Sequence, residues 1–277
     1  MSPRLAAALA VDRAVRRRAA TEVIPLPGGL VVRHPELFDV HYLNALLLDA
    51  GAEAERDAAA LPALADRWLG DLHHRHLVFD DAGAAERVAA ELRSRGWERR
   101  RVVFMALAPD AEVITADARA REITGHEMEA LQLAALREEV PEAAVRAGLP
   151  ERLAATQRAL RAGTRSACFG AGENGDLQSM CTLFLDPDVG GQRVAMIEEV
   201  ATLRAHRGRG LARAAVGAAV AAAGAWGAEL TVVPADADDW PQLMYARMGF
   251  APLGRQVSLT LRVRPGTPAR GFRDGGL

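Results

Sequence analysis

The sequence predicts an α/β protein with a mixed sheet, and two observations lead to that prediction. In the second half of the chain, short apolar runs typical of strands alternate with amphipathic or alanine-rich runs typical of helices. The first half repeats the alternation in a shorter form, around the apolar run HLVFDD at 76–81. Such alternation is typical of a sheet that is covered by helices. We therefore expect two α/β regions.

The first region is expected to end where polar residues gather at about 109–118. Before that point the pattern indicates helices at 5–20, 61–74 and 84–95, strands at 28–35, 76–81 and 95–107, and helical or mixed structure at 35–50. We therefore predict a smaller α/β domain over residues 1–110 and a second domain over 111–277.

The second region begins with two helical runs and continues with strands. Helices are expected at 119–138, 141–162, 211–227 and 238–248, and strands at 164–172, 176–186, 194–203, 228–234 and 254–263. The run GENGD at 172–176 is a strong turn signal, so the first two strands should form an antiparallel hairpin.

Composition limits the function classes. The 277 residues are 50% hydrophobic and 25% charged, which is typical of a globular protein with an extensive core. All 34 basic residues are arginine, a bias that we attribute to a GC-rich, bacterial genome. The net charge of −2 does not favour nucleic acid or anionic membranes. Cys168 and Cys181 are too few for a disulfide framework, and no apolar run reaches the ~20 residues of a membrane span. We expect a cytoplasmic protein that binds neither membrane nor nucleic acid.

The run RGRGLA at 207–212 stands between an apolar strand and an alanine-rich helix. A helix that starts there presents free backbone N–H groups and a partial positive charge to an anion. Gly208 and Gly210 would leave room for a phosphate, and Arg207 and Arg209 would add charge. The spacing is neither that of a P-loop nor the GxGxxG dinucleotide fingerprint. A pyrophosphate-binding turn is therefore favoured over a plain turn.

This run resembles the acetyl-CoA motif R/Q-x-x-G-x-G/A of GNAT acetyltransferases. Tyr245 to Phe250, YARMGF, resembles a second GNAT signature, Y-x-x-x-G-F, in the order and at the spacing of that family. The resemblance covers roughly residues 110–265. It implies a GNAT-like, mixed and mostly antiparallel sheet flanked by helices. It also implies an N-acetyltransferase that moves an acetyl group from acetyl-CoA directly to a primary amine of a small molecule or peptide.

The resemblance also implies roles for individual residues. The backbone of Val200 and Thr202 would pair with the pantetheine arm. The pyrophosphate would lie on the amides of the turn, which are those of Arg207, Gly208, Arg209, Gly210, Leu211 and Ala212. Glu198 would act as general base and Tyr245 as general acid. Because neighbouring strand residues point to opposite faces, only one of Glu198 and Glu199 is expected to face the cleft, and Glu198 is preferred.

Other interpretations stay open. The chain could be a non-catalytic acyl-CoA sensor, or a scaffold that binds nucleic acid through its arginine-rich first helix, although we prefer a solvated face for Arg13, Arg16, Arg17 and Arg18. No metal is expected: His73, His74 and His76 have no ligand partners at an established spacing. Segment 119–162 would recognise the acceptor, and a homodimer is possible. The stretches 78–96 and 232–249 share a pattern, so the first domain could be a degenerate GNAT-like half.

Overall fold

The computed structural model describes residues 1–51, 59–108, 117–189 and 191–263. The chain forms two compact units. The larger unit combines residues 1–19 with 101–255, and the smaller unit combines residues 20–100 with the described residues from 256 onward. The domain boundary predicted near residue 110 lies outside the described residues, and the predicted domains 1–110 and 111–277 stay a prediction.

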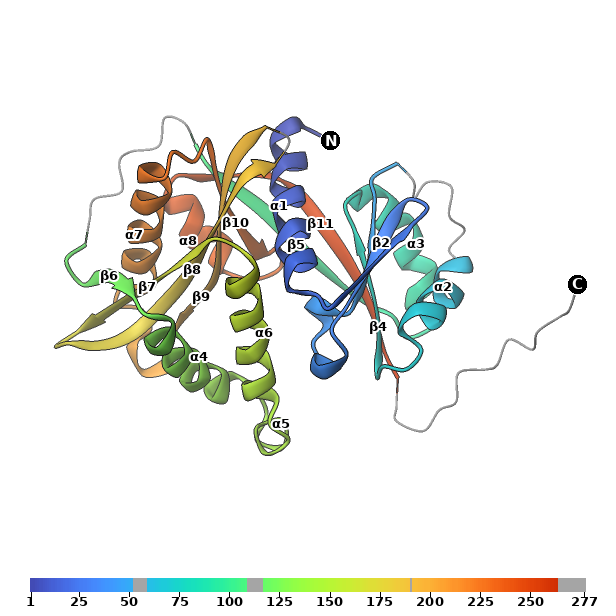
Figure 1. Cartoon of the computed structure of the whole chain (residues 1–277), viewed down its shortest axis with the longest axis horizontal. Helices are drawn as coiled ribbons and strands as arrows, with labels where there is room; N and C mark the ends of the chain where they lie inside the picture. Colours follow the sequence, from blue (N-terminus) through green and yellow to red (C-terminus); the bar gives the residue numbers. More distant parts are fainter. Residues whose placement is uncertain (52–58, 109–116, 190, 264–277) are drawn as a thin grey trace, which may run out of the picture. The chain divides into compact units, whose positions relative to one another are not determined.

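The larger unit is built on six strands and the helices that cover them (Figure 1). Its helices are α1 (Pro3–Ala19), α4 (Gly125–Glu139), α5 (Glu142–Arg146), α6 (Leu149–Gly163), α7 (Leu211–Ala225) and α8 (Pro241–Arg247). Its strands are β5 (Glu98–Leu107), β6 (Ala120–Ile123), β7 (Ser166–Glu173), β8 (Asp176–Val189), β9 (Gln192–Thr202) and β10 (Leu230–Asp236), with the start of β11 (Phe250–Arg262). They lie in the order β5-β10-β9-β8-β7-β6, and only β9 and β10 run parallel. The expected mixed, mostly antiparallel sheet is confirmed.

Each face of this sheet has its own helices. Leu183 and Ile197 point to the face that α7 and α8 cover, together with Tyr245. Cys168 and Met180 point to the opposite face, where they pack against α4. Helix α1 packs on α6, β8 and β9, so it lies on the same face as α4 and α6. The two faces of the sheet therefore pack against different helices, and the face to which a side chain points decides which residues it contacts.

The parallel pair β9–β10 separates partway along its length. Pairing runs from Val194 with Leu230 to Met196 with Val232 and then stops. Strand β9 nevertheless continues to Thr202 and β10 to Asp236, so neither strand pairs with the other beyond that point. The edge of β9 that faces β10 is open over its last six residues.

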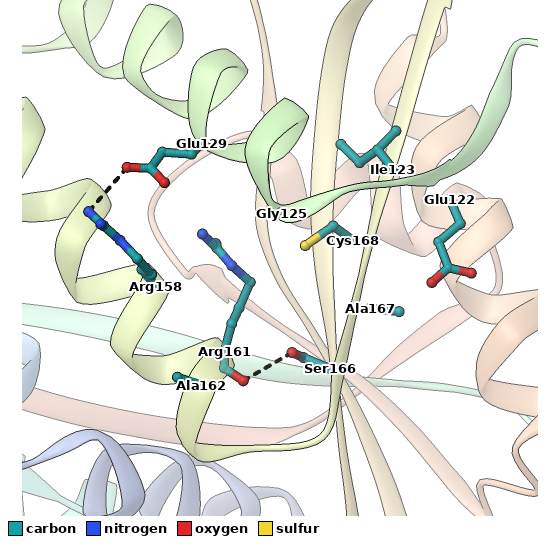
Figure 2. A pocket seen from close by; sticks show the side chains of 10 residues that line it. All are labelled: Glu122, Ile123, Gly125, Glu129, Arg158, Arg161, Ala162, Ser166, Ala167 and Cys168. Atoms are coloured by element: carbon teal, nitrogen blue, oxygen red, sulfur yellow. Dashed lines mark hydrogen bonds and ion pairs between the residues drawn. The ribbon is translucent and has the colours of Figure 1, made fainter.

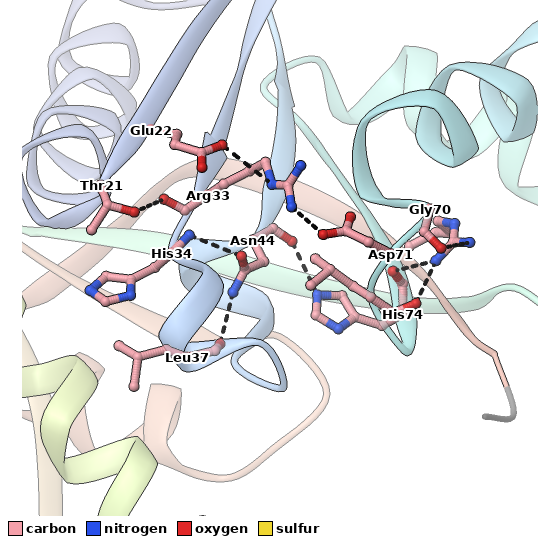
Figure 3. Close-up of polar contacts among 11 residues, drawn as sticks. Thr21, Glu22, Arg33, His34, Leu37, Asn44, Gly70, Asp71 and His74 are labelled. Carbon is pink, nitrogen blue, oxygen red and sulfur yellow. Dashed lines mark hydrogen bonds and ion pairs between the residues drawn. The ribbon is translucent and has the colours of Figure 1, made fainter. Parts of the chain in front are cut away.

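The smaller unit is also built from strands and helices. Its strands are β1 (Glu22–Leu26), β2 (Gly29–Arg33), β3 (Ala45–Leu48), β4 (His74–Phe79) and the end of β11, and its helices are α2 (Ala60–Leu69) and α3 (Ala82–Arg93). Two short 3₁₀ helices, Pro35–Leu37 and His41–Leu43, precede β3. The order is β1-β2-β3-β4-β11, with β3 and β4 parallel and the other pairs antiparallel. Asn44 joins these elements: its Nδ2 donates to the Leu37 carbonyl and its own carbonyl lies 3.2 Å from Nε2 of His74 (Figure 3).

Most predicted elements are present, and two of the predicted helices differ in the structure. The predicted helix 119–138 is a four-residue strand followed by α4, which Thr124 and Glu127 begin with a capping box. The predicted helix 141–162 is two helices that Gly148 separates. The hairpin around GENGD is confirmed as β7 and β8, and both cysteines are free and buried, as small core residues.

Candidate functional site

The turn RGRGLA lies exposed at the end of β9. A 3₁₀ helix, Arg204–His206, follows the strand, and α7 begins at Leu211. Gly208 and Gly210 both have φ of +78°, a conformation that other residues rarely adopt, so the turn depends on glycine. A Cβ atom built on Gly208 would meet no atom within 4 Å, which means that the space beside the backbone is open. The positive φ values of both glycines are therefore present, and the phosphate that they would admit stays a prediction.

The amides of this turn have few partners within the protein. In the described part of the chain, no backbone carbonyl accepts from the amides of residues 208–210, and Gly210 caps α7 without a side chain. The first amides of α7 have no partner inside the helix either, as at any helix N-terminus. The turn thus offers a row of free N–H groups and the positive end of a 15-residue helix to an anion.

The arginines of the turn already pair with carboxylates. Nε of Arg207 donates to the Thr202 carbonyl at 3.1 Å, and its guanidinium pairs with Glu139. Nη1 of Arg209 lies 3.1 Å from Oε2 of Glu173. Any positive charge that these arginines give to an incoming anion is shared with the carboxylates. The free amides are therefore the principal anion-binding groups of the turn.

The open edge of β9 carries Val200 and Thr202, the two residues expected to pair with a pantetheine arm. Both are half-buried, and β10 does not pair with either of them. Two groups of Thr202 already have partners: its carbonyl accepts from Arg207, and its hydroxyl lies 2.9 Å from Oγ of Ser179. The unpaired edge can accept an extended chain as an added strand, and its C-terminal end leads into the glycine turn.

A bulge in β9 changes the directions of the two glutamates. The register between β8 and β9 shifts between Met180 and Thr182, and Glu199 has φ of +57°. Glu198 stands opposite Thr182, and cross-strand partners point to the same face. Glu199 also bonds to Thr182, with its Oε2 2.9 Å from Oγ1. The expectation that only one glutamate faces the candidate site is therefore wrong, because the bulge brings both carboxylates to one face.

Glu199 is held by three side chains from three elements. Besides Thr182 of β8, the Gln132 amide of α4 donates to it, and Nη1 of Arg161 of α6 lies 3.1 Å from its Oε2. The Glu199 and Arg161 side chains are only 7% and 10% exposed. Burial raises the pKa of Glu199 to about 7, although Arg161, Thr182 and Gln132 oppose that rise. Its acceptor sites are largely used in holding α4 and α6 to the sheet.

Glu198 has different surroundings. Burial is the main cause that raises its pKa to about 8, and the charges of Asp12 and Glu199 raise it further. Arg16 and the backbone N–H of Glu199 act in the opposite direction. Among the described residues, no side chain donates a hydrogen bond to its carboxylate, and the residue is half-buried. Of the two carboxylates, Glu198 is the one free to exchange a proton.

Tyr245 lies on helix α8, on the opposite face of the sheet from the one to which Glu198 points. Its side chain is 4% exposed in the core under α8, and its ring meets Phe250 edge to face at 6.0 Å between centroids. Burial raises the pKa of its hydroxyl, and the charges of Glu198 and Cys181 raise it further. Tyr245 is therefore a neutral proton donor at any ordinary pH, within electrostatic reach of the Glu198 carboxylate.

A pocket of about 440 Å³ opens on the α4 and α6 face (Figure 2). It is lined by Glu122, Ile123, Gly125, Glu129, Arg158, Arg161, Ala162, Ser166, Ala167 and Cys168. Arg158 pairs with Glu129 at 3.1 Å, whereas the Arg161 side chain connects the pocket to Glu199. Sequence reasoning assigned acceptor recognition to 119–162 without locating a pocket; the charged residues that line it follow no recognisable motif.

Two other groups of polar side chains have structural roles. Asp238 pairs with Arg101, and its amide donates to Asp236 Oδ1, which stabilises the bend before α8. The rings of His41 and His74 lie 4.2 Å apart, and burial lowers the pKa of His74 to about 4. Within the described ranges, no group of three or more His, Cys, Asp or Glu could hold a metal ion. No helix in those ranges is both long and apolar enough to cross a bilayer.

A strand pair that opens beside a turn with free amides can hold an extended ligand that ends in phosphates. Residues 127–250 match the family model described as the acetyltransferase (GNAT) family. This part of the chain therefore carries the match to the GNAT family that the resemblance implied.

Solved structures resemble the whole fold. A GCN5-related N-acetyltransferase from Kribbella flavida is 20% identical, with a TM-score of 0.66 over 94% of this chain and 96% of its own. A conserved protein of unknown function from Staphylococcus epidermidis is 11% identical, with a TM-score of 0.62 over 88% and 95%. A GCN5-related N-acetyltransferase from Sphaerobacter thermophilus is 16% identical, with a TM-score of 0.50 over 76% and 69%. A comparison with curated proteins gave no match.

Proposed function

We propose that the chain is an acetyl-CoA-dependent N-acetyltransferase that moves an acetyl group directly to a primary amine of a small molecule or peptide. The observation that supports this most strongly is the separation of β9 from β10 after Met196, next to the free amides of residues 208–210. An extended arm and a pyrophosphate need these two features side by side. The family match of residues 127–250 also supports this proposal.

Acetyl-CoA would bind along the open edge of β9. Backbone groups of Val200 and Thr202 would hold the pantetheine arm. The Arg207 side chain, which donates to the Thr202 carbonyl, would move away from this carbonyl or share it with the arm. The amides of Arg207, Gly208, Arg209, Gly210, Leu211 and Ala212 would hold the pyrophosphate. The αL glycines bring this backbone close to the phosphates without a side chain between them.

Glu198 would act as general base and Tyr245 as general acid. Glu198 takes a proton from the ammonium of the acceptor, which frees the nitrogen lone pair to attack the thioester carbonyl carbon. The carbon–sulfur bond then breaks, Tyr245 gives its proton to the departing thiolate of CoA, and the proton that the new amide nitrogen loses restores the tyrosine hydroxyl. A base whose pKa is raised to about 8 has the strength to deprotonate an amine near neutral pH.

Calorimetric titration with acetyl-CoA tests the proposal. Wild type is expected to bind, and Gly210→Glu is expected to lose affinity by about 100-fold or more, because a carboxylate would face the phosphates. Gly224→Glu is a matched control: it lies exposed near the end of α7, and a Cβ built on it would meet no atom within 4 Å. No heat with wild type, or equal losses in both variants, would refute the pyrophosphate site.

The same protein then serves for catalysis. Wild type, Glu198→Gln and Tyr245→Phe are incubated with acetyl-CoA and a library of primary amines, and products are identified by mass spectrometry. Acetylated amine from wild type, and at least about tenfold less from each variant at unchanged acetyl-CoA affinity, supports an enzyme. Binding of acetyl-CoA without any product would favour the acyl-CoA sensor instead.

A further inference from the structure

The first helix buries two charged residues. Asp12 and Arg16 of α1 are 3% and 6% exposed, within a stripe that also buries Leu5, Ala8 and Ala19. Nε of Arg16 lies 3.0 Å from Oδ2 of Asp12. Arg16 was expected on a solvated helix face, so that expectation is wrong for this arginine.

Helix α1 is fixed to the larger unit at both of its ends. Near its end, Arg18 lies 2.7 Å from Asp186 of β8, whose side chain is only 2% exposed. A Cβ atom at Gly163 of α6 would lie 2.9 Å from the Arg18 carbonyl oxygen, so glycine permits this close approach. Near its start, Leu5 packs so tightly on Gly254 that a Cβ there would overlap it. The positions of Asp12 and Arg16 are therefore set by the packing of α1 on the sheet.

Stability does not account for a buried ion pair at this place. Two charges lose their hydration on burial, and well-packed apolar residues of similar size are often as stabilising or more so. The neighbours along the stripe show that this helix face otherwise uses apolar residues to pack. A reason for the pair has to come from what it faces.

The pair lies on the side of the sheet to which the Glu198 carboxylate points. Helix α1 packs on β9, and Glu198 points to that face because it stands opposite Thr182. The charged groups that act on Glu198 are Asp12 and Arg16 from α1 and Glu199 from its own strand. The charge of Glu198 in turn raises the pKa of Tyr245 in α8. Asp12 raises the pKa of Glu198 and Arg16 lowers it. Arg161, Gln132 and Thr182, from α6, α4 and β8, contact Glu199 instead.

We propose that Asp12 and Arg16 are a positioning pair of the acetyl-transfer site, through which the N-terminal helix sets the electrostatic surroundings of the Glu198 carboxylate. This inference rests on the proposed function, in which Glu198 is the base. It assigns residues 1–19 to the machinery of a domain whose family match begins only at residue 127. The pair touches neither substrate in this scheme and acts through Glu198.

Two substitutions that remove charges of opposite sign test the role of the pair. In Asp12→Asn a negative charge is lost, so the acidic limb of the kcat/KM profile should move to lower pH by about one unit. In Arg16→Gln a positive charge is lost, and the limb should move to higher pH by a similar amount. Arg16→Lys keeps the charge and should leave the limb in place. One acceptor amine is used throughout, so its own titration is common to all variants.

A matched surface control and a measurement without substrate complete the test. Arg17→Gln removes an exposed charge from the same helix and should not move the limb. The ¹³C shift of the Glu198 carboxyl, titrated in free wild type and Arg16→Gln protein, reports the same displacement even if Asp12→Asn does not fold. Shifts in the same direction, or no shift with activity and acetyl-CoA affinity intact, would overturn the pair's role. Failure of wild type to bind acetyl-CoA would instead refute the proposed function.

Discussion

The two units each contain one parallel strand pair joined by a helix, yet only one pair opens. In the smaller unit, β3 and β4 stay paired to their last residues, Leu48 with Phe79. In the larger unit, β9 runs six residues past Met196, its last residue that pairs with β10. A strand–helix–strand crossover is thus not enough to make a ligand site. The strands must also separate, so that backbone groups become available to a ligand.

The units also differ in the groups that they bury beside these strands. The larger unit buries carboxyl groups, and the pKa values of Glu198 and Glu199 are raised to about 8 and about 7. The smaller unit buries imidazoles, and the pKa of His74 is lowered to about 4. Carboxylates with raised pKa values suit proton transfer near neutral pH, whereas a buried neutral imidazole suits packing. The buried groups and the strand geometry therefore both favour the larger unit as the place of the proposed proton transfer.

The largest effect that separates the units should appear in binding stoichiometry. We expect one acetyl-CoA per chain, abolished by Gly210→Glu and unchanged by Gly51→Glu. Gly51 follows β3 as Gly210 follows β9, it also has positive φ, and no atom lies within 4 Å of a Cβ built there. Backbone strain is thus similar in both variants, and only the site differs. Two sites per chain by calorimetry, or a loss with Gly51→Glu, would mean that the smaller unit also binds the ligand.

The second effect distinguishes the two buried carboxylates of the larger unit. Glu198→Gln should lower kcat by about 10²–10⁴-fold with little change in melting temperature, since the amide cannot take the proton. Glu199→Gln should act mainly on stability, because it weakens the contacts to Arg161 and Thr182. Steady-state kinetics and thermal melts of both variants measure this. The reverse pattern would make Glu199 the base.

The sequence predicted the glycine turn better than it predicted the directions of the two glutamates. Glycines at 208 and 210 have a conformational requirement that a pattern can reveal, and the helix start at Leu211 follows from them. The bulge at Glu199 has no such signal, because a glutamate in the αL region is imposed by its tertiary contacts. Its consequence, two carboxylates on one face, could not be predicted from strand alternation.

Two other features were missed for related reasons. Strand β6 has four residues, and its exposed Arg121 and Glu122 gave it no apolar alternation. In α1, Asp12 and Arg16 have the spacing of a solvated i,i+4 pair, and only packing reveals that they are buried. Charged residues are seldom buried, so patterns place them in solvent by default. A buried pair of charged side chains is an exception to this rule, and the sequence pattern does not reveal it.

The third effect is a difference in pH dependence of stability. Glu198 binds its proton more tightly in the folded state, so its contribution to the unfolding free energy falls as pH rises from about 4.5 to 8. His74 binds its proton less tightly in the folded state, so its contribution rises with pH from about 4 to 6.5. Thermal melts between about pH 4 and 9 should therefore show opposite slopes at the two ends.

Variants assign each slope to its group. Glu198→Gln should flatten the alkaline side of the melting profile, and His74→Gln should flatten the acidic side. Between about pH 4.5 and 6.5 both groups titrate, so there the two variants should change the slope in opposite directions, and above about pH 6.5 His74→Gln should leave the profile unchanged. If Glu198→Gln alters only the acidic side, the carboxylate does not carry a raised pKa in the folded protein, and its assignment as base loses its electrostatic support.

The smallest effect compares how two helices begin. Asp81 caps α3 by accepting from the amides of Gly83 and Ala84 at 2.8 and 3.1 Å, whereas α7 begins at Gly210 with no side-chain cap. Asp81→Ala should cost about 1 kcal/mol of unfolding free energy and leave acetyl-CoA affinity unchanged. Gly210→Asn, which tolerates the αL region, should change stability by only about a few tenths of a kcal/mol yet weaken acetyl-CoA binding. Denaturant titration and calorimetry on the same samples test both, and weaker acetyl-CoA binding in Asp81→Ala would contradict the division of roles. A helix start that its own side chain satisfies supports the fold, and one left unsatisfied is available to a ligand.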